Sequence, residues 1–154
     1  MDLRELLDIN SVAVGVEADN KKALIDAVID LIADAEAVED VDEVRNAVHR
    51  RESTMSTGVG KGLALPHAKT SAVTGVVAAL ITTKEPVEFG ALDNAPVQIV
   101  FLLVGKQDAK SQHVRILSRF SRMMNRDENR DLILSATTAE GLLDSIYKAE
   151  ATLN

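Results

Sequence analysis

The sequence predicts one α/β sandwich, in which a central sheet of about four to five strands lies between layers of helices, an α/β/α arrangement. Apolar runs rich in β-branched residues indicate strands, and apolar residues three and four apart indicate helices. The expected order is strand, two helices, three strands and three helices. We expect the 154 residues, 1–154, to form a single domain, because no linker or repeat interrupts this order.

The first third of the chain is expected to form one strand and two helices. After a short helical turn at 2–7, valines at alternate positions predict a strand over 11–16. Asp19 or Asn20 can cap the first long helix, whose apolar residues form one stripe. The second helix is predicted over 40–52, and the glycine-rich segment that follows it, up to Lys61, is predicted to be a loop.

The remainder is expected to form three strands and then three helices. The last two strands are apolar on both faces, so we expect helices on each side of them. The final helix begins near Thr137 and Glu140, which have capping-box spacing. The predicted strands are 62–67, 75–82 and 97–105, and the predicted helices are 108–125, 128–134 and 138–150.

Composition narrows the classes of function. Seventeen basic against 24 acidic residues give a net charge of −7, which disfavours a nucleic acid or an anionic membrane as the main partner. Without cysteine the chain has no disulfide and no thiolate metal site. The N-terminus lacks the apolar core of a signal peptide, and no apolar run approaches the roughly twenty residues of a membrane span. We therefore expect a soluble, cytoplasmic protein without direct membrane insertion.

The glycines around Lys61 do not form a nucleotide-binding motif. A P-loop needs glycine at position 55 and serine or threonine at position 62, but Met55 and Gly62 stand there. A dinucleotide fingerprint fails too, because the loop leads into a strand. Closely spaced glycines can still direct backbone N–H groups toward an anion.

Arg51 is the first of three candidate catalytic residues. It falls on the apolar stripe of Val44 and Val48, at the end of the helix nearest the glycine loop. It can be a cation of a site or a side chain that only extends past the core to solvent. His49 and Arg50 point away from this stripe, so we expect them on the solvated surface.

His113 and His67 are the other two candidates. His113 lies on the inward face of its helix near the N-terminus, where it can be a core residue or meet an anion. His67 follows Pro66, which should end or bend the strand, and it can be structural or a reagent. Metal ligation is disfavoured because only the outward-pointing His49 remains as a third ligand. No cofactor is indicated.

The segment GVGKGLALPHAKT, with the preceding RREST, resembles the active-site signature of the enzyme IIA components of the bacterial phosphoenolpyruvate-dependent sugar phosphotransferase system. The resemblance is to the fructose/mannitol class, which includes the nitrogen-regulatory enzyme IIA. It continues through EFGALDNAPVQIVFLLV and QHVRILSRFSRMM. Many family members have glycine where this chain has Ala68, a change that keeps the site small.

The resemblance implies a mixed sheet between helical layers and a role for each candidate. His67 matches the phosphorylated histidine, Arg51 the phosphate-binding arginine and His113 the second active-site histidine. By this resemblance His67 accepts a phosphoryl group from the phosphocarrier protein HPr and passes it to an enzyme IIB component. Because the sequence contains neither a IIB nor a membrane-spanning IIC domain, an alternative is a nitrogen-regulatory protein that binds and regulates partners according to the phosphorylation of His67.

Overall fold

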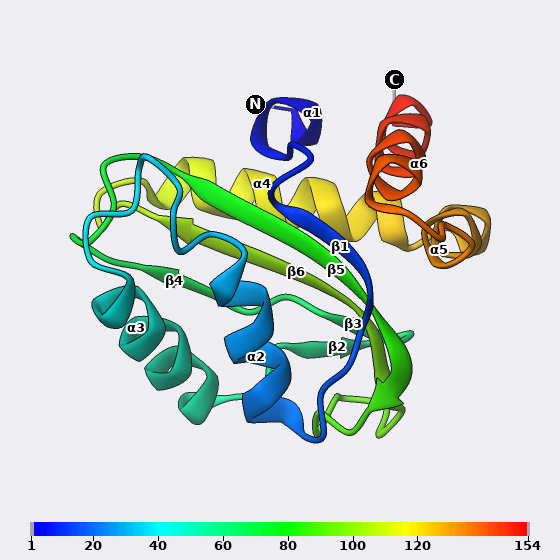
Figure 1. Ribbon diagram of the computed structural model, residues 1–154, viewed down its shortest axis with the longest axis horizontal. Coiled ribbons are helices and arrows are strands. Elements are labelled where there is room, and N and C mark those ends of the chain that lie inside the picture. The colour runs from blue at the N-terminus through cyan, green and yellow to red at the C-terminus, as the bar shows by residue number, and fades with distance from the viewer. Residues whose placement is uncertain (1, 154) are drawn as a thin grey trace.

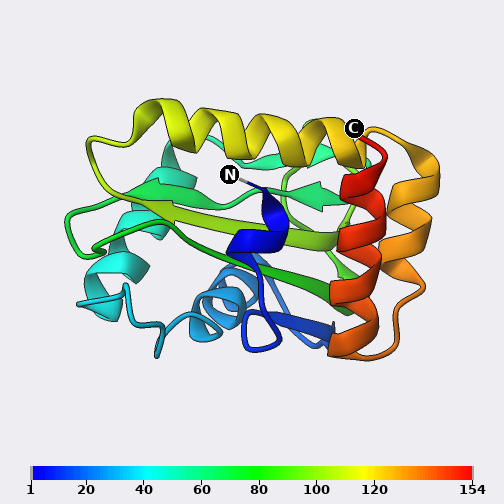
Figure 2. The ribbon, with the colours of Figure 1, turned by 90° about the horizontal axis from the view of Figure 1, so that it is seen from above.

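A six-stranded mixed sheet lies between two layers of helices in the computed structural model, which describes residues 2–153 (Figure 1). Seen from above, α4 covers one face of the sheet with α5 and α6 beside it, whereas α2 and α3 cover the other (Figure 2). The elements are α1 (Leu3–Leu6), β1 (Val12–Val16), α2 (Lys21–Asp30), α3 (Val41–Thr54), β2 (Gly58–Gly60), β3 (Leu63–Ala64), β4 (His67–Lys69), β5 (Val77–Val87), β6 (Val97–Gly105), α4 (Lys110–Met124), α5 (Asp127–Leu134) and α6 (Ala139–Ala151).

Strand β6 is the central strand of the sheet. It pairs antiparallel with β5 on one side, and on its other side it pairs parallel with β3 and then with β4. Strand β1 pairs parallel with β5, and β2 pairs antiparallel with β3. Within residues 2–153, strand β4 pairs only with β6, and α3 lies alongside β4 (Figure 1).

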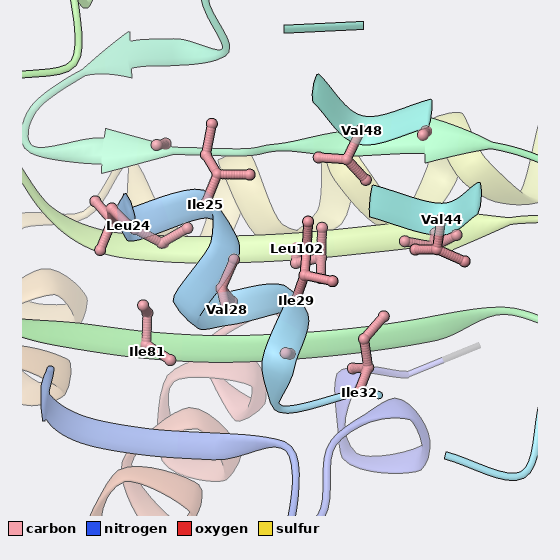
Figure 3. Packing of buried hydrophobic residues seen from close by; sticks show 14 of the residues in the cluster. Leu24, Ile25, Val28, Ile29, Ile32, Val44, Val48, Ile81 and Leu102 are labelled. Atoms are coloured by element: carbon pink, nitrogen blue, oxygen red, sulfur yellow. The ribbon is translucent and has the colours of Figure 1, made fainter. Parts of the chain in front are cut away.

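The core consists of two apolar layers, one on each face of the sheet. Figure 3 shows the layer beneath α2 and α3, where Val48 of α3 and Ile29 of α2 pack toward Leu102 of β6. On the opposite face, Phe101 stacks on Phe120 of α4 with ring centroids 4.3 Å apart. Because successive side chains of a strand point to opposite faces, β6 is apolar along its whole length, as predicted from the sequence.

The structure confirms the α/β class and the mixed sheet, but it has more strands than the four or five predicted. Residues 58–60, predicted as loop, form β2, because Gly60 (φ 97°) and Gly62 (φ 77°) allow a tight turn that pairs this segment with β3. The strand predicted over 62–67 is interrupted before Pro66, which lacks an N–H, and becomes β3 and β4.

The predicted N-terminal cap is confirmed for α2 and wrong for α6. The side chain of Asn20 accepts a hydrogen bond from the Ala23 amide and caps α2. At α6 the cap is Thr138, which accepts from the Gly141 amide, and not the predicted Thr137. None of the helices within residues 2–153 is long and apolar enough to cross a bilayer.

Candidate active site

His67 is the first residue of β4 and its ring has a defined orientation. Its Nδ1 lies 2.8 Å from the backbone carbonyl oxygen of Leu65. Because a carbonyl oxygen only accepts hydrogen bonds, Nδ1 must carry the proton, and the lone pair of the neutral ring is on Nε2. The Pro66 carbonyl accepts from the Leu103 amide at 3.1 Å and so holds the segment before His67 against β6. The half-buried ring therefore presents one nucleophilic nitrogen.

His113 lies beside His67, although 46 positions separate them in the chain. The two ring centroids are 5.3 Å apart, with the ring planes inclined by 58°. His113 belongs to the first turn of α4 and is 5% exposed, yet neither of its ring nitrogens has a hydrogen-bond partner within residues 2–153. Gly105 makes room for it, since a Cβ atom there would lie 3.2 Å from His113 Nδ1.

Arg51 comes from α3, on the other side of β4. The half-buried side chain donates from Nη1 to the Met55 carbonyl at 3.0 Å, and Nη1 is 3.4 Å from the Thr54 hydroxyl. These contacts hold the guanidinium at the C-terminal end of α3. Its inward position agrees with the helical stripe on which the sequence placed it.

The three predicted residues line one open cleft of about 540 Å³. The cleft lies between α3, β4 and the first part of α4, so segments that are distant in sequence meet around it. No carboxylate is among its lining residues, which are Ala47, Arg50, Arg51, Thr54, His67, Ala68, Lys69, His113, Val114 and Leu117. In a protein with a net charge of −7, this cleft is a local concentration of positive charge.

Both histidines of the cleft have a lowered pKa. For His67 the main cause is burial; the hydrogen bond to Leu65 opposes the shift, and the nearby charge of Arg51 adds to it. The pKa of His113 is lowered to about 4, chiefly by burial and then by the charges of His67 and Lys69. Both rings are therefore neutral near pH 7, and His67 can act as a nucleophile there.

Sequence reasoning missed two cations of the cleft. Arg50 is exposed, as predicted, but its long side chain lines the cleft. Lys69 stands two residues after His67 in the same strand, a spacing that places both side chains on one face. The alternation of side chains along a strand could have indicated Lys69. It applies only if the strand continues past His67, whereas the sequence predicted that the strand ends there.

The prediction for His49 was wrong. Its ring is not simply solvated, because Nε2 lies 2.7 Å from the Asp26 carboxylate, which also pairs with Arg45 at 3.0 Å. The helical wheel correctly turned His49 away from Arg51, but it could not show that α2 covers that side of α3. His49 is thus a histidine outside the cleft.

The glycine loop lies away from the cleft. Its hairpin pairs Leu63 with Ile99, whereas His67 pairs with Leu103, four residues farther along β6. The Lys61 amide donates to the Asp93 carboxylate at 3.0 Å, so this loop amide binds a side chain of the protein itself. The predicted possibility of an anion held by these glycines finds no support in this arrangement.

Comparison with known proteins identifies the family of this chain. Residues 5–149 match the family described as phosphoenolpyruvate-dependent sugar phosphotransferase system, EIIA 2. The chain belongs to this EIIA family. The match covers all three residues around the cleft, and it confirms the resemblance drawn from the sequence.

Curated relatives of this EIIA chain include sugar-specific and regulatory proteins. It is 32% identical over 146 residues to the fructose-specific EIIABC component of Bacillus subtilis, covering 95% of the chain but 23% of that relative. It is also 32% identical over 148 residues to the nitrogen regulatory protein of Pseudomonas aeruginosa, covering 96% of each. The chain thus spans about a quarter of the first relative and nearly all of the second.

Solved structures show the same fold. The nitrogen regulatory protein IIA-Ntr of Neisseria meningitidis matches with a TM-score of 0.87 at 28% identity, over 94% of this chain and 98% of that one. The mannitol IIA of Escherichia coli, solved in complex with phosphorylated IIB, matches with a TM-score of 0.78 at 17% identity, over 92% and 97% of the two chains. The second likeness concerns the fold alone.

Proposed function

We propose that this EIIA chain is a phosphocarrier whose His67 accepts a phosphoryl group from phospho-HPr on Nε2 and passes it to an enzyme IIB component. One observation supports this most strongly: the 2.8 Å contact between Nδ1 and the Leu65 carbonyl, which leaves Nε2 as the nucleophile of a ring held in a cationic cleft. His67 is neutral near pH 7 because burial lowers its pKa.

The chemical step balances without an added reagent. The lone pair of His67 Nε2 attacks phosphorus, a new N–P bond forms, and the donor's N–P bond breaks with its electron pair returning to the donor ring. The His67 ring gains positive charge, which the Leu65 carbonyl stabilises by accepting the Nδ1–H bond. Donor and product are both phosphoramidates, so this first transfer is nearly balanced and reversible.

The surroundings of His67 suit the transition state of this transfer. Negative charge spreads over the equatorial phosphoryl oxygens as the two N–P bonds exchange. Arg51 of α3 can donate N–H groups to these oxygens, and the ring of His113 of α4 can donate one N–H. Groups that are already in place lose little entropy when the phosphoryl group arrives.

Labelling experiments test the assignment of the acceptor. Incubation with phosphoenolpyruvate, enzyme I and HPr should label the wild-type chain with radioactive phosphate, and His67→Ala should abolish the label. His49→Ala is the matched control, because it removes a histidine outside the cleft, and it should be labelled like the wild type. Undiminished labelling of His67→Ala would refute the proposal.

A second function is favoured by one comparison, the 32% identity over 148 residues with the nitrogen regulatory protein of Pseudomonas aeruginosa. In this alternative the phosphate on His67 controls the binding of regulated proteins. A chase of labelled protein with candidate IIB proteins separates the two: transfer to a IIB supports the carrier role. Phosphorylation-dependent capture of other proteins, with no IIB acceptor, supports the regulatory one.

A further inference from the structure

Lys69 shares one face of β4 with His67. Alternate residues of a strand point to the same side, so the side chains of His67 and Lys69 share one face of β4, and both residues line the cleft. Their Cα atoms are about 7 Å apart at two residues' spacing, a distance that a four-carbon lysine stem can bridge. The ammonium of Lys69 can thus reach a group bonded to His67.

The positive charge of Lys69 lowers the pKa of both histidines, and no ion pair within residues 2–153 neutralises it. This charge is one of the smaller causes of the lowered pKa of His67 and of His113, and burial is the largest cause for both. Within residues 2–153, Lys69 forms no ion pair with a carboxylate. An unpaired ammonium beside two neutral rings is placed to receive an anion.

We propose that Lys69 is a further catalytic residue, whose ammonium binds the phosphoryl oxygens while the group is transferred to and from His67. This inference rests on the proposed phosphocarrier function. A phosphoryl group has a charge of about −2, more than the single charge of Arg51 offsets. Arg51 approaches from α3 and Lys69 from β4, so the two cations meet the phosphoryl oxygens from different elements.

A charge-removing variant tests the proposal against a matched control. Lys69→Met should slow transfer from phospho-HPr about ten- to a hundred-fold, the range for one charged hydrogen bond. Lys69→Arg should recover part of the loss. Lys106→Met makes the same change in net charge at an exposed lysine next to Gly105, outside the cleft, and should match the wild type.

Steady-state kinetics separates phosphoryl binding from partner docking. If Lys69 contacts the phosphoryl group, Lys69→Met lowers kcat at saturating phospho-HPr, whereas a docking contact would raise only KM. A normal kcat in Lys69→Met would overturn the proposal while leaving the phosphocarrier function intact. Failure of the wild-type chain to accept phosphate would instead refute the underlying function.

A titration of the unphosphorylated protein needs no activity. Lys69→Met should raise the pKa of both His67 and His113, measured from their ring resonances by NMR, because a nearby positive charge is removed. Lys106→Met should leave both unchanged. Unaltered pKa values in Lys69→Met would show that the ammonium lies too far from the cleft and would overturn the proposal.

Discussion

The ring centroids of His113 and His67 lie 5.3 Å apart, and His113 has no hydrogen-bond partner for either nitrogen within residues 2–153. Buried polar groups are nearly always paired, and an unpaired one costs about 1–3 kcal/mol. A phosphoryl oxygen that entered the cleft could supply such a partner, because it can accept a hydrogen bond from a ring N–H of His113.

The first prediction concerns acid stability. The pKa of His113 is about 4 in the folded protein against an ordinary 6.5, so the unfolded chain binds the proton first. The contribution of His113 to the free energy of unfolding thus falls as pH decreases from about 6.5 to about 4, by about 2 kcal/mol at pH 5. Urea unfolding between neutral pH and about pH 5 measures this loss.

His113→Gln should remove that part of the acid sensitivity, because glutamine does not titrate. If the variant retained the wild-type dependence of unfolding free energy on pH, the buried, neutral state of His113 would be contradicted. His49→Gln is a suitable comparison, since His49 is paired with Asp26 outside the cleft.

A second prediction uses the same His113→Gln variant in phosphoryl transfer. The acceptor nitrogen of His67 remains, so the chain should still be labelled, but about ten- to a hundred-fold more slowly because a ring N–H donor to the transition state is replaced. Rapid-quench measurement of the first turnover gives the rate. A wild-type rate would remove His113 from the proposed machinery.

The third prediction concerns the geometry of Arg51. Its Nη1 is held by the Met55 carbonyl at 3.0 Å, which fixes the plane of the guanidinium. Arg51→Lys keeps the charge but loses the planar fork, so we expect transfer about tenfold slower or worse. Equal rates for Arg51→Lys and the wild type would show that only net charge matters at this position.

The fourth prediction concerns Glu52, the residue after Arg51. Its buried carboxylate accepts from the Thr57 amide at 2.7 Å and from the Thr57 hydroxyl, and it pairs with Lys21 at 2.9 Å. Glu52→Ala should lower the free energy of unfolding by about 2–3 kcal/mol by leaving these donors unpaired. Glu43→Ala on the same helix should change it by less than about 0.5 kcal/mol. Similar losses in both variants would contradict this role of Glu52.

Local patterns in the sequence predicted the class of fold, and these patterns together with the family resemblance predicted the three main residues of the cleft. The stripe of Val44 and Val48 turns Arg51 inward, and the same periodicity turns His113 inward on its own helix. The apolar character of β6 on both faces indicated helices on each side of it. These features depend on spacing along one element and need no knowledge of the neighbours.

What escaped sequence reasoning depends on contacts between elements. Strand β2 exists because its hairpin partner β3 pairs with β6, and His49 is partly covered because α2 packs beside α3. Glu52 lies four residues after Val48 on the apolar stripe, but the donors that make its burial favourable come from Thr57 and Lys21. Such partners are not visible in the pattern of a single helix.

The most direct test of the proposed function is to identify the nitrogen of His67 that receives the phosphoryl group. After phosphorylation with phosphoenolpyruvate, enzyme I and HPr, long-range ¹H–¹⁵N NMR of the histidine rings, with ¹⁵N–³¹P coupling, identifies the nitrogen bonded to phosphorus. We expect phosphorus on Nε2 of His67, with Nδ1 still protonated and hydrogen-bonded to the Leu65 carbonyl. Phosphorus on Nδ1 of His67, or on any other residue, would contradict the proposal.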